Sequence, residues 1–361
     1  MRALKLAALM LLAVACAKEG ANNSGTASST ASSSSSRGSV DLTGAGATFP
    51  YPLYSKWFSE YANLTGVKIN YQSIGSGGGI RQLSEGTVDF GASDSPMSDE
   101  ELAKAKGGPI LHIPTVLGAV VITYNVPGLS APLNLTAKAI ADIFSGRVTK
   151  WSDTRIKSLN PGVTLPGTDI LVVHRSDGSG TTYIFTDYLT TAVPAWATSV
   201  GKGKEVKWPV GLGAKGNEGV AGQVKQTPGA IGYVELAYAK QNNLPTAAVA
   251  NKAGKGVLPS VAAVTDAAAA AAAALPANTD YRISIVNAPG ADSYPISSFT
   301  WILVYQHQTD PVKGKKLVDF LNWALTQGEA EAASLDYAPL PTSMASSVKA
   351  RLTTIDLSGA K

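Results

Sequence analysis

The run RSDGSGT at residues 175–181 places one arginine beside glycines and hydroxyl side chains, directly before a predicted helix. Glycine lets the backbone approach a ligand closely, and serine and threonine add hydroxyl donors, so the run suits a tetrahedral oxyanion. Arg175 can bind two oxygens of such an anion through its guanidinium fork. Asp177 lies close enough in sequence to fix the orientation of that arginine. Taken alone, a run of this kind is equally typical of a simple helix cap.

Three further segments place small polar residues before predicted helices, at residues 47–49, 75–77 and 93–94. The first turn of a helix carries unpaired amide groups and a partial positive charge. Several such turns that converge on one point can bind a small anion without many lysines. The four segments together therefore favour anion binding over helix capping.

Asp94 is the informative residue among these segments, because a carboxylate repels an anion that has no proton to share. Hydrogen phosphate carries a proton, whereas sulfate at neutral pH does not. A buried acceptor for that proton therefore predicts a site that selects phosphate, since unmatched polar groups discriminate strongly between analogues. The alternative interpretation is that Asp94 caps the helix that follows Pro96.

The elements that must position these residues alternate along the chain, which indicates an α/β fold with mainly parallel strands. Expected strands cover residues 40–42, 67–71, 88–92, 170–173 and 230–235, and residues 43–48 are expected to form a glycine-rich loop. Expected helices cover residues 136–144, 183–189 and 261–274, and Ser98 with Glu101 forms a capping box. Asp310 should cap the final long helix, which ends at Gly328. Long apolar stretches at 110–124 and 294–305 are the expected crossings between two lobes, the first of them within residues 115–120.

The first residues resemble an export signal, with Arg2 and Lys5 followed by an apolar run of roughly ten residues that is too short to span a bilayer. The run ends at Cys16, in a context similar to the processing site of bacterial lipoproteins, where the cysteine is lipidated. The alternative is an ordinary secretory signal that is cleaved nearby. Residues 17–39 are rich in serine, threonine, glycine and alanine, and this composition predicts a flexible tether.

Composition and motifs exclude several other classes of protein. The net charge of +4 falls to +2 once Arg2 and Lys5 are removed with the leader. The sequence contains no basic stripe interleaved with aromatic residues, which is the pattern that would predict nucleic-acid binding. His174, Ser176 and Asp177 lie too close in sequence to form a hydrolytic triad, and no nucleophile elbow is present. Residues 211–217 have the glycine spacing of a P-loop without its lysine. Three histidines and one cysteine give no metal-ligand spacing.

Seven motifs, in order and with similar spacing from about residue 40 to the end, resemble those of the periplasmic phosphate-binding proteins of bacterial ABC transporters. They are LTGAGATFP (42–50), YQSIGSGGG (71–79), VDFGASD (88–94), RSDGSGT (175–181), KWPVGLG (207–213), TPGAIGYVE (227–235) and LDYAPLP (335–341). Gly77 stands where the family often has serine, and His174 replaces a basic neighbour of the arginine.

The resemblance implies the two-lobed fold of periplasmic-binding proteins of type II, in which each lobe is a mixed, mainly parallel sheet flanked by helices. A two-strand hinge joins the lobes, and the ligand cleft lies between them. Lobe 1 would comprise residues 40–117 plus 298–361, and lobe 2 residues 118–297. The implied phosphate ligands are Thr48, Phe49, Ser76, Asp94, Arg175, Ser179, Gly180 and Thr181, with Asp177 and Gly77 in supporting positions.

The resemblance also implies a function without catalysis, cofactor or metal. The protein would capture inorganic phosphate outside the cytoplasm and deliver it to ABC permease subunits, which are coupled to an ATPase, while Cys16 anchors it to the membrane. Two alternatives stay open at this stage. The same fold could bind sulfate, molybdate or another oxyanion, or the chain could be a phosphate-binding surface or signalling protein.

Overall fold

The computed structural model describes residues 41–129, 131–272 and 279–359. The predicted leader, the predicted lipidation site Cys16 and the predicted tether at 17–39 lie outside the described residues. The described residues belong to one compact unit.

Eleven strands are present in the described part of the chain. They are β1 (Leu42–Gly46), β2 (Ile69–Ser73), β3 (Phe90–Ser93), β4 (Ile110–Tyr124), β5 (Asn134–Leu135), β6 (Leu171–Arg175), β7 (Leu212–Ala214), β8 (Ala230–Glu235), β9 (Ala248–Ala250), β10 (Gly256–Val257) and β11 (Ser297–Tyr305).

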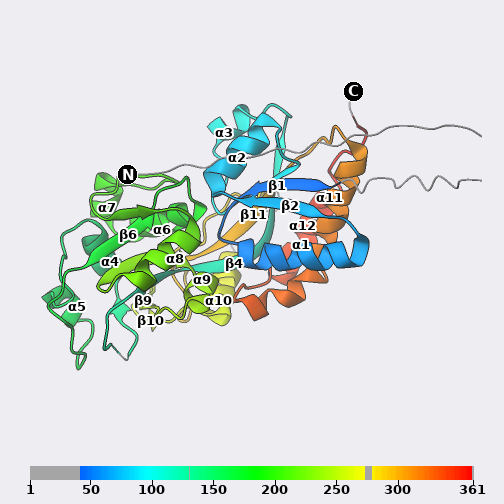
Figure 1. Cartoon of the computed structure of the whole chain (residues 1–361). Coiled ribbons are helices and arrows are strands. Elements are labelled where there is room, and N and C mark those ends of the chain that lie inside the picture. The colour runs from blue at the N-terminus through cyan, green and yellow to red at the C-terminus, as the bar shows by residue number, and fades with distance from the viewer. Residues whose placement is uncertain (1–40, 130, 273–278, 360–361) are drawn as a thin grey trace, which may run out of the picture. The chain divides into compact units, whose positions relative to one another are not determined.

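Eight of these strands form one sheet in the order β2-β1-β3-β11-β4-β8-β6-β7, and β10, β9 and β5 form a small second sheet. The long strand β4 pairs antiparallel with β11 as far as Ala119 and with β8 from Val120 onward. We call β2, β1, β3 and β11 the first section of the sheet and β8, β6 and β7 the second section. In Figure 1, β4 and β11 run between the blue elements around α1 and the green elements around α6. The fold is thus α/β: β1 pairs in parallel with β2 and β3, and β6 pairs in parallel with β7 and β8, whereas β11 is antiparallel to β3 and β4 is antiparallel to both β11 and β8.

Helices connect the strands and cover the sheet. They are α1 (Tyr51–Thr65), α2 (Ser76–Glu85), α3 (Asp99–Ala103), α4 (Ala137–Phe144), α5 (Thr154–Lys157), α6 (Gly180–Ala192), α7 (Pro194–Ser199), α8 (Gly216–Gln226), α9 (Leu236–Gln241), α10 (Val261–Ala272), α11 (Pro311–Ala324) and α12 (Thr342–Leu352), with 3-10 turns η1 (Gly328–Glu331) and η2 (Ala333–Leu335). Asp310 caps α11 as expected, and the expected stripe of Leu317, Phe320, Leu321 and Ala324 is buried.

The prediction for the first motif was wrong in one respect. The expected loop at 43–48 is mostly strand, because β1 extends through Gly46 and is paired in parallel with β2 on one side and β3 on the other. Packing requires a glycine at position 44, because an added Cβ would lie 2.2 Å from the ring of Phe90. The glycines of this motif therefore allow a close-packed strand rather than a loop.

One alternative interpretation and one prediction about helices were also wrong, whereas the predicted capping box was confirmed. The helix after residues 93–94 begins only at Asp99, with the predicted capping box of Ser98 and Glu101, so Asp94 neither caps it nor directly precedes it. The helix capped by Asp310 ends at Ala324 and is not the last one, because η1, η2 and α12 follow. Gly328, the predicted stop, lies in η1.

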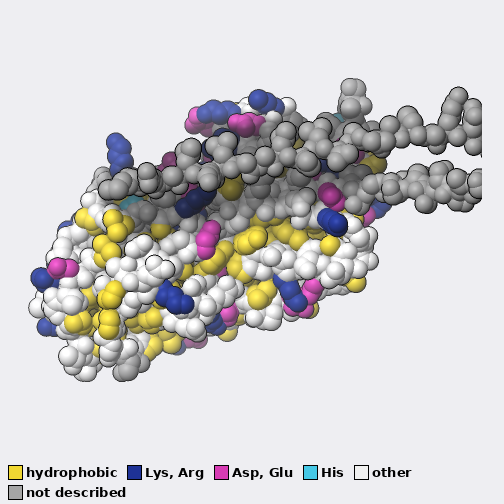
Figure 2. All heavy atoms as spheres, viewed as in Figure 1, with side chains coloured by type: hydrophobic (Ala, Val, Ile, Leu, Met, Phe, Trp, Pro, Cys, Tyr) yellow, Lys and Arg dark blue, Asp and Glu magenta, His cyan; other side chains and the backbone are white. Residues whose placement is uncertain are grey.

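None of the helices within the described ranges is both long enough and apolar enough to cross a membrane. On the face shown in Figure 2, lysines and arginines are interspersed with aspartates and glutamates among neutral side chains. In the part of this face that the undescribed residues leave uncovered, the basic side chains form no continuous area of the kind that nucleic-acid binding requires.

Candidate anion-binding site

The predicted site residues follow the carboxyl ends of four strands, which is where ligands bind in open α/β sheets. Thr48 and Phe49 lie between β1 and α1, Ser76 opens α2 after β2, Asp94 follows β3, Arg175 ends β6, and Ser179, Gly180 and Thr181 open α6. The first three positions belong to the first section of the sheet and the last two to the second. All eight residues are buried.

Ser76, Asp94 and Gly180 meet directly, although they come from both sections. The Ser76 hydroxyl accepts a hydrogen bond from the backbone N–H of Gly180 at 3.1 Å and from that of Asp94 at 3.2 Å. A side chain at Gly180 would place its Cβ 2.5 Å from both Ser76 Oγ and Asp94 Oδ2. Only glycine therefore lets the two sections approach this closely.

Arg175 is held by a bidentate ion pair with Asp177. Its Nε and Nη2 donate to the two carboxylate oxygens at 2.8 and 2.5 Å, and its Nη1 donates to Thr181 Oγ1 at 3.3 Å. A guanidinium has five N–H donors, so these three bonds leave one hydrogen on each Nη for a ligand. Burial would raise the pKa of Asp177, but the hydrogen bonds and charge of Arg175 lower it below its ordinary value, and the carboxylate stays ionised.

Asn217 is a residue that the sequence analysis missed. Its Nδ2 donates to Thr48 Oγ1 at 2.7 Å and to Thr181 Oγ1 at 3.1 Å, so one amide group connects the two sections. Asn217 lies in the first turn of α8, after β7. The same strand, turn and helix pattern as in the other motifs could have identified it, but the segment was considered only as a P-loop.

The four hydroxyl groups of the site share one property: each accepts hydrogen bonds from N–H groups. Thr48 accepts two from Asn217, Ser76 accepts from Asp94 and Gly180, Ser179 accepts from Thr182, and Thr181 accepts from Arg175 and Asn217. A hydroxyl whose lone pairs are engaged in this way still has its own hydrogen to donate. The site is therefore built to donate hydrogen bonds, as an anion requires.

Asp94 is the acceptor in this environment. Its Oδ1 accepts a hydrogen bond from the Thr300 hydroxyl of β11 at 2.9 Å. Burial raises its pKa to about 7, although Thr300, the charge of Arg175 and Ser76 each act to lower it. Near neutral pH this carboxyl can therefore exist with or without its proton, and it responds to whether a neighbouring ligand carries one.

Tyrosine hydroxyls fix the backbone carbonyls of residues 48 and 49. Tyr238 donates to the carbonyl of Thr48 and Tyr337 to that of Phe49, both at 2.6 Å. Tyr337 also donates to the buried Glu235 at 3.1 Å. Burial raises the pKa of Glu235 well above its ordinary value, which disfavours a negative charge beside the site.

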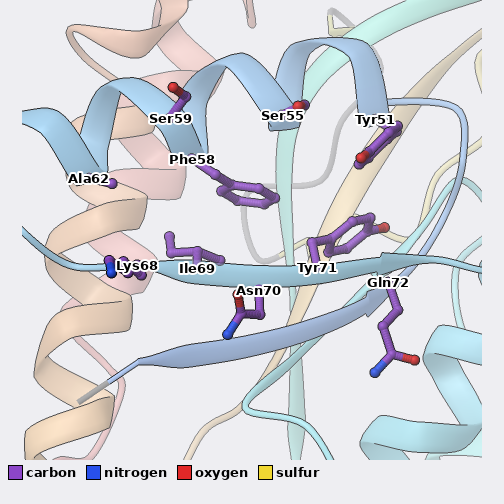
Figure 3. A pocket seen from close by; sticks show the side chains of 10 residues that line it. All are labelled: Tyr51, Ser55, Phe58, Ser59, Ala62, Lys68, Ile69, Asn70, Tyr71 and Gln72. Atoms are coloured by element: carbon purple, nitrogen blue, oxygen red, sulfur yellow. The ribbon is translucent and has the colours of Figure 1, made fainter. Parts of the chain in front are cut away.

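Hollows in the described surface also lie outside this cluster, and two of them reach about 500 Å³ or more. A groove of about 500 Å³ between α1 and the edge strand β2 is lined by Tyr51, Phe58, Tyr71 and neutral polar side chains, with Lys68 at one end (Figure 3). It contains none of the predicted site residues and has no acceptor or donor cluster suited to an anion. A second hollow, of about 670 Å³, is lined by Gly77, Asp177 and Lys204 among others and adjoins the place where the two sections meet. Within the described ranges, no group of His, Cys, Asp and Glu side chains could hold a metal ion.

Comparison with known proteins places this geometry in a family. Residues 24–327 match the profile of the PBP superfamily domain. The chain is 47% identical over 311 residues to the phosphate-binding protein PstS of Pasteurella multocida, covering 86% of this chain and 89% of that protein. It is 41% identical over 320 residues to PstS of Methanocaldococcus jannaschii, covering 83% of this chain and 82% of that protein.

Solved structures agree on the fold. A phosphate-binding protein from Stenotrophomonas maltophilia superposes with a TM-score of 0.68 at 23% identity, covering 89% of this chain and 96% of that one. A high-affinity periplasmic phosphate-binding protein, PfluDING, superposes with a TM-score of 0.68 at 24% identity, covering 86% of this chain and 93% of that one. This chain has the two-lobed fold of periplasmic-binding proteins, and it belongs to the PstS family of phosphate-binding proteins within the PBP superfamily.

Proposed function

We propose that the protein binds inorganic phosphate outside the cytoplasm and delivers it to the permease of an ABC phosphate importer. The observation that carries the proposal is the cluster of buried hydroxyl donors around Arg175, with Asp94 as its acceptor. The names and identities of the PstS relatives support the same ligand and the same transport system. Phosphate is a ligand here and not a cofactor.

The proposed ligands are the eight residues predicted from the sequence, with Asp177 and Gly77 in supporting positions. The hydroxyls of Thr48, Ser76, Ser179 and Thr181 and the backbone amides of Phe49 and Gly180 would donate to phosphate oxygens. Arg175 would donate through the N–H groups that Asp177 and Thr181 leave unused. Asp94 would accept the hydrogen of the phosphate.

Selection of phosphate over sulfate would follow from Asp94. A carboxylate that faces a protonless oxyanion is left without a hydrogen to accept and adds charge repulsion, whereas hydrogen phosphate satisfies it. Mismatches of this kind discriminate by roughly 10⁴ to 10⁵. Sulfate and molybdate are therefore not favoured as ligands.

Binding would couple to closure about β4 and β11, with lobe 1 at residues 40–117 plus 298–361 and lobe 2 at 118–297. The change of partner along β4 after Ala119 supports this division, since it falls two residues beyond the proposed boundary. The hydrogen bond from Gly180 to Ser76 and the ion pair of Lys204 with Glu101, at 2.6 Å, both join the proposed lobes. Opening would break such bonds, and a shared ligand would restore closure.

The proposal includes no catalysis, because the PstS relatives are phosphate-binding proteins of a transport system. His174, the nearest histidine in sequence, stacks on Trp208 with ring centroids 4.8 Å apart and bonds only the carbonyl of Arg175. We further propose that Cys16 carries a lipid anchor. A Cys16→Ser variant should then be recovered in the soluble fraction, and equal retention of both proteins in the membrane fraction would contradict the anchor.

Calorimetry of the purified protein, freed of phosphate, tests the binding proposal directly. Phosphate should bind with a dissociation constant on the order of micromolar or below. Arsenate, which carries the same proton, should bind more weakly but measurably, and sulfate should not compete. Equal affinities for phosphate and sulfate would refute the role of Asp94, and no phosphate binding at all would refute the function.

A further inference from the structure

Thr300 lies 206 residues away from Asp94 in sequence, and no sequence motif announces it. Its side chain is fully buried on β11, and its hydroxyl donates to Asp94 Oδ1 at 2.9 Å. Thr300 is not among the proposed phosphate ligands. The effect of Thr300 on Asp94 depends on how β11 orients the threonine side chain and on which carboxylate oxygen accepts its hydrogen bond.

The backbone places Thr300 by means of a β-bulge. Thr300 is paired with Val116 on β4 but Trp301 is paired with Pro114, so Thr115 is an extra residue on β4. The hydroxyl of Thr115 donates to the carbonyl of Thr300 at 3.3 Å and lies 2.7 Å from the hydroxyl of Tyr54. Bulges re-aim individual side chains and are common next to functional sites. Here the bulge falls at the residue whose hydroxyl meets Asp94.

The two oxygens of Asp94 have different surroundings. Thr300 donates to Oδ1 at 2.9 Å, whereas Oδ2 accepts only a long hydrogen bond from Ser76 Oγ, at 3.5 Å, and faces Gly180, whose added Cβ would come within 2.5 Å of it. Oδ2 therefore points toward the donor groups of the proposed anion site. A bound phosphate would draw the Ser76 hydroxyl to its own oxygens, and Oδ2 would then accept the hydrogen of the phosphate.

We infer that Thr300 is a positioning and specificity-determining residue, which blocks Oδ1 of Asp94 and so makes Oδ2 a single, oriented acceptor for the phosphate hydrogen. The inference rests on the proposed function of the site. Thr300 also stabilises the ionised carboxylate, because its hydroxyl donates a hydrogen bond to Oδ1. The hydroxyl can donate to Oδ1 only while Oδ1 carries no proton, so any proton on Asp94 must sit on Oδ2. Without Thr300, a buried Oδ1 would lack a partner and Asp94 would hold its own proton more tightly.

The groups whose charges act on Asp94 include one cation and four tyrosines. Arg175 is the cation, and its charge lowers the pKa of Asp94. The tyrosines that interact with Asp94 have pKa values raised by burial and stay neutral; they are Tyr54 on α1, Tyr71 on β2, Tyr238 on α9 and Tyr337 after η2. A change in the pH dependence of binding in a Thr300 variant would therefore report on Asp94.

The test replaces Thr300 by valine, which keeps the shape and removes the hydroxyl. Phosphate binding at pH 7 should weaken about ten- to a hundred-fold, the equivalent of one hydrogen bond to a charged group. The loss should shrink as the pH rises from 6 to 9, because high pH removes the extra proton from Asp94. Sulfate should gain affinity relative to phosphate, since a protonated Asp94 can donate to it.

Two variants control for structural damage. Thr300→Ser restores the hydroxyl and should restore the pH profile and the rejection of sulfate. Thr123→Val removes another fully buried threonine hydroxyl, which lies on β4 and donates to the carbonyl of Pro245, and it should leave both properties unchanged. If Thr300→Val does not fold, Thr300→Ala removes the same hydroxyl and is measured in its place.

The outcomes separate the inference from the function on which it rests. If the wild-type protein fails to bind phosphate, the proposed function is wrong and the inference falls with it. If the wild type binds but Thr300→Val keeps the wild-type pH profile and sulfate rejection, the inference alone is overturned. A uniform loss of affinity at every pH, with sulfate still rejected, would also overturn it, because that result indicates a purely structural role.

Discussion

Replacement of Asp94 by asparagine should stabilise the phosphate-free protein, and the gain should depend on pH. Burial raises the pKa of Asp94 from 3.8 to about 7, so the folded protein binds this proton more tightly than the unfolded chain does. The folded state is therefore penalised as the pH rises from about 4 to about 7, and the full penalty is present above pH 7. A shift of about 3 units corresponds to about 4 kcal/mol.

Urea denaturation of both proteins at a series of pH values measures this penalty. The free energy of unfolding of Asp94→Asn minus that of the wild type should increase by about 3 kcal/mol between pH 5 and pH 8, the part of the penalty that falls in this interval. Other buried acids, such as Glu235, are present in both proteins and cancel in the difference. A difference that is the same at pH 5 and pH 8 would refute the assignment of a raised pKa to Asp94.

Three further predictions concern ligand binding. Arg175→Ala should abolish measurable phosphate binding in calorimetry while the circular dichroism spectrum stays that of the wild type, and a variant that still binds normally would remove the arginine from the site. Asp94→Asn should relax the rejection of sulfate, measured by competition, because an amide can donate where a carboxylate cannot; unchanged rejection would contradict the proton argument. Gly180→Ala should weaken phosphate binding at least 100-fold, since its Cβ would lie 2.5 Å from Asp94 and Ser76 and prevent closure. Gly222→Ala on α8, where an added Cβ meets nothing within 4 Å, is the matched control and should bind like the wild type.

Local patterns in the sequence predicted most elements that begin or end with a capping residue. The box of Ser98 and Glu101 and the cap at Asp310 involve residues within three positions of each other, so a single short segment contains all the necessary information. The apolar stretch 110–124 is a single strand because every one of its residues is buried. The two caps do not depend on partners far away in the chain, whereas the burial of 110–124 depends on its pairing with β11 and β8.

Features that depend on distant partners were predicted poorly. The glycines of β1 resembled a loop because Phe90, which requires a glycine opposite it, belongs to another strand. Thr300 stands in an apolar strand and meets Asp94 only because β11 is inserted between β3 and β4. The sequence indicates only an incomplete P-loop around Asn217, because its two hydroxyl partners lie 169 and 36 residues away and no local pattern predicts them. Without the sheet order, none of these contacts can be derived from the chain.

The shared strand β4 makes the body a single cooperative unit. Because all of its residues are buried and its two ends complete different sections of the sheet, neither section can melt without removing a strand from the other. Chains of this size often unfold in steps, one part before the next. Here a half-molecule would expose a long apolar strand edge, of the kind that promotes aggregation. Heating should therefore give one transition, and fragments cut between residues 117 and 118 should be insoluble when expressed separately.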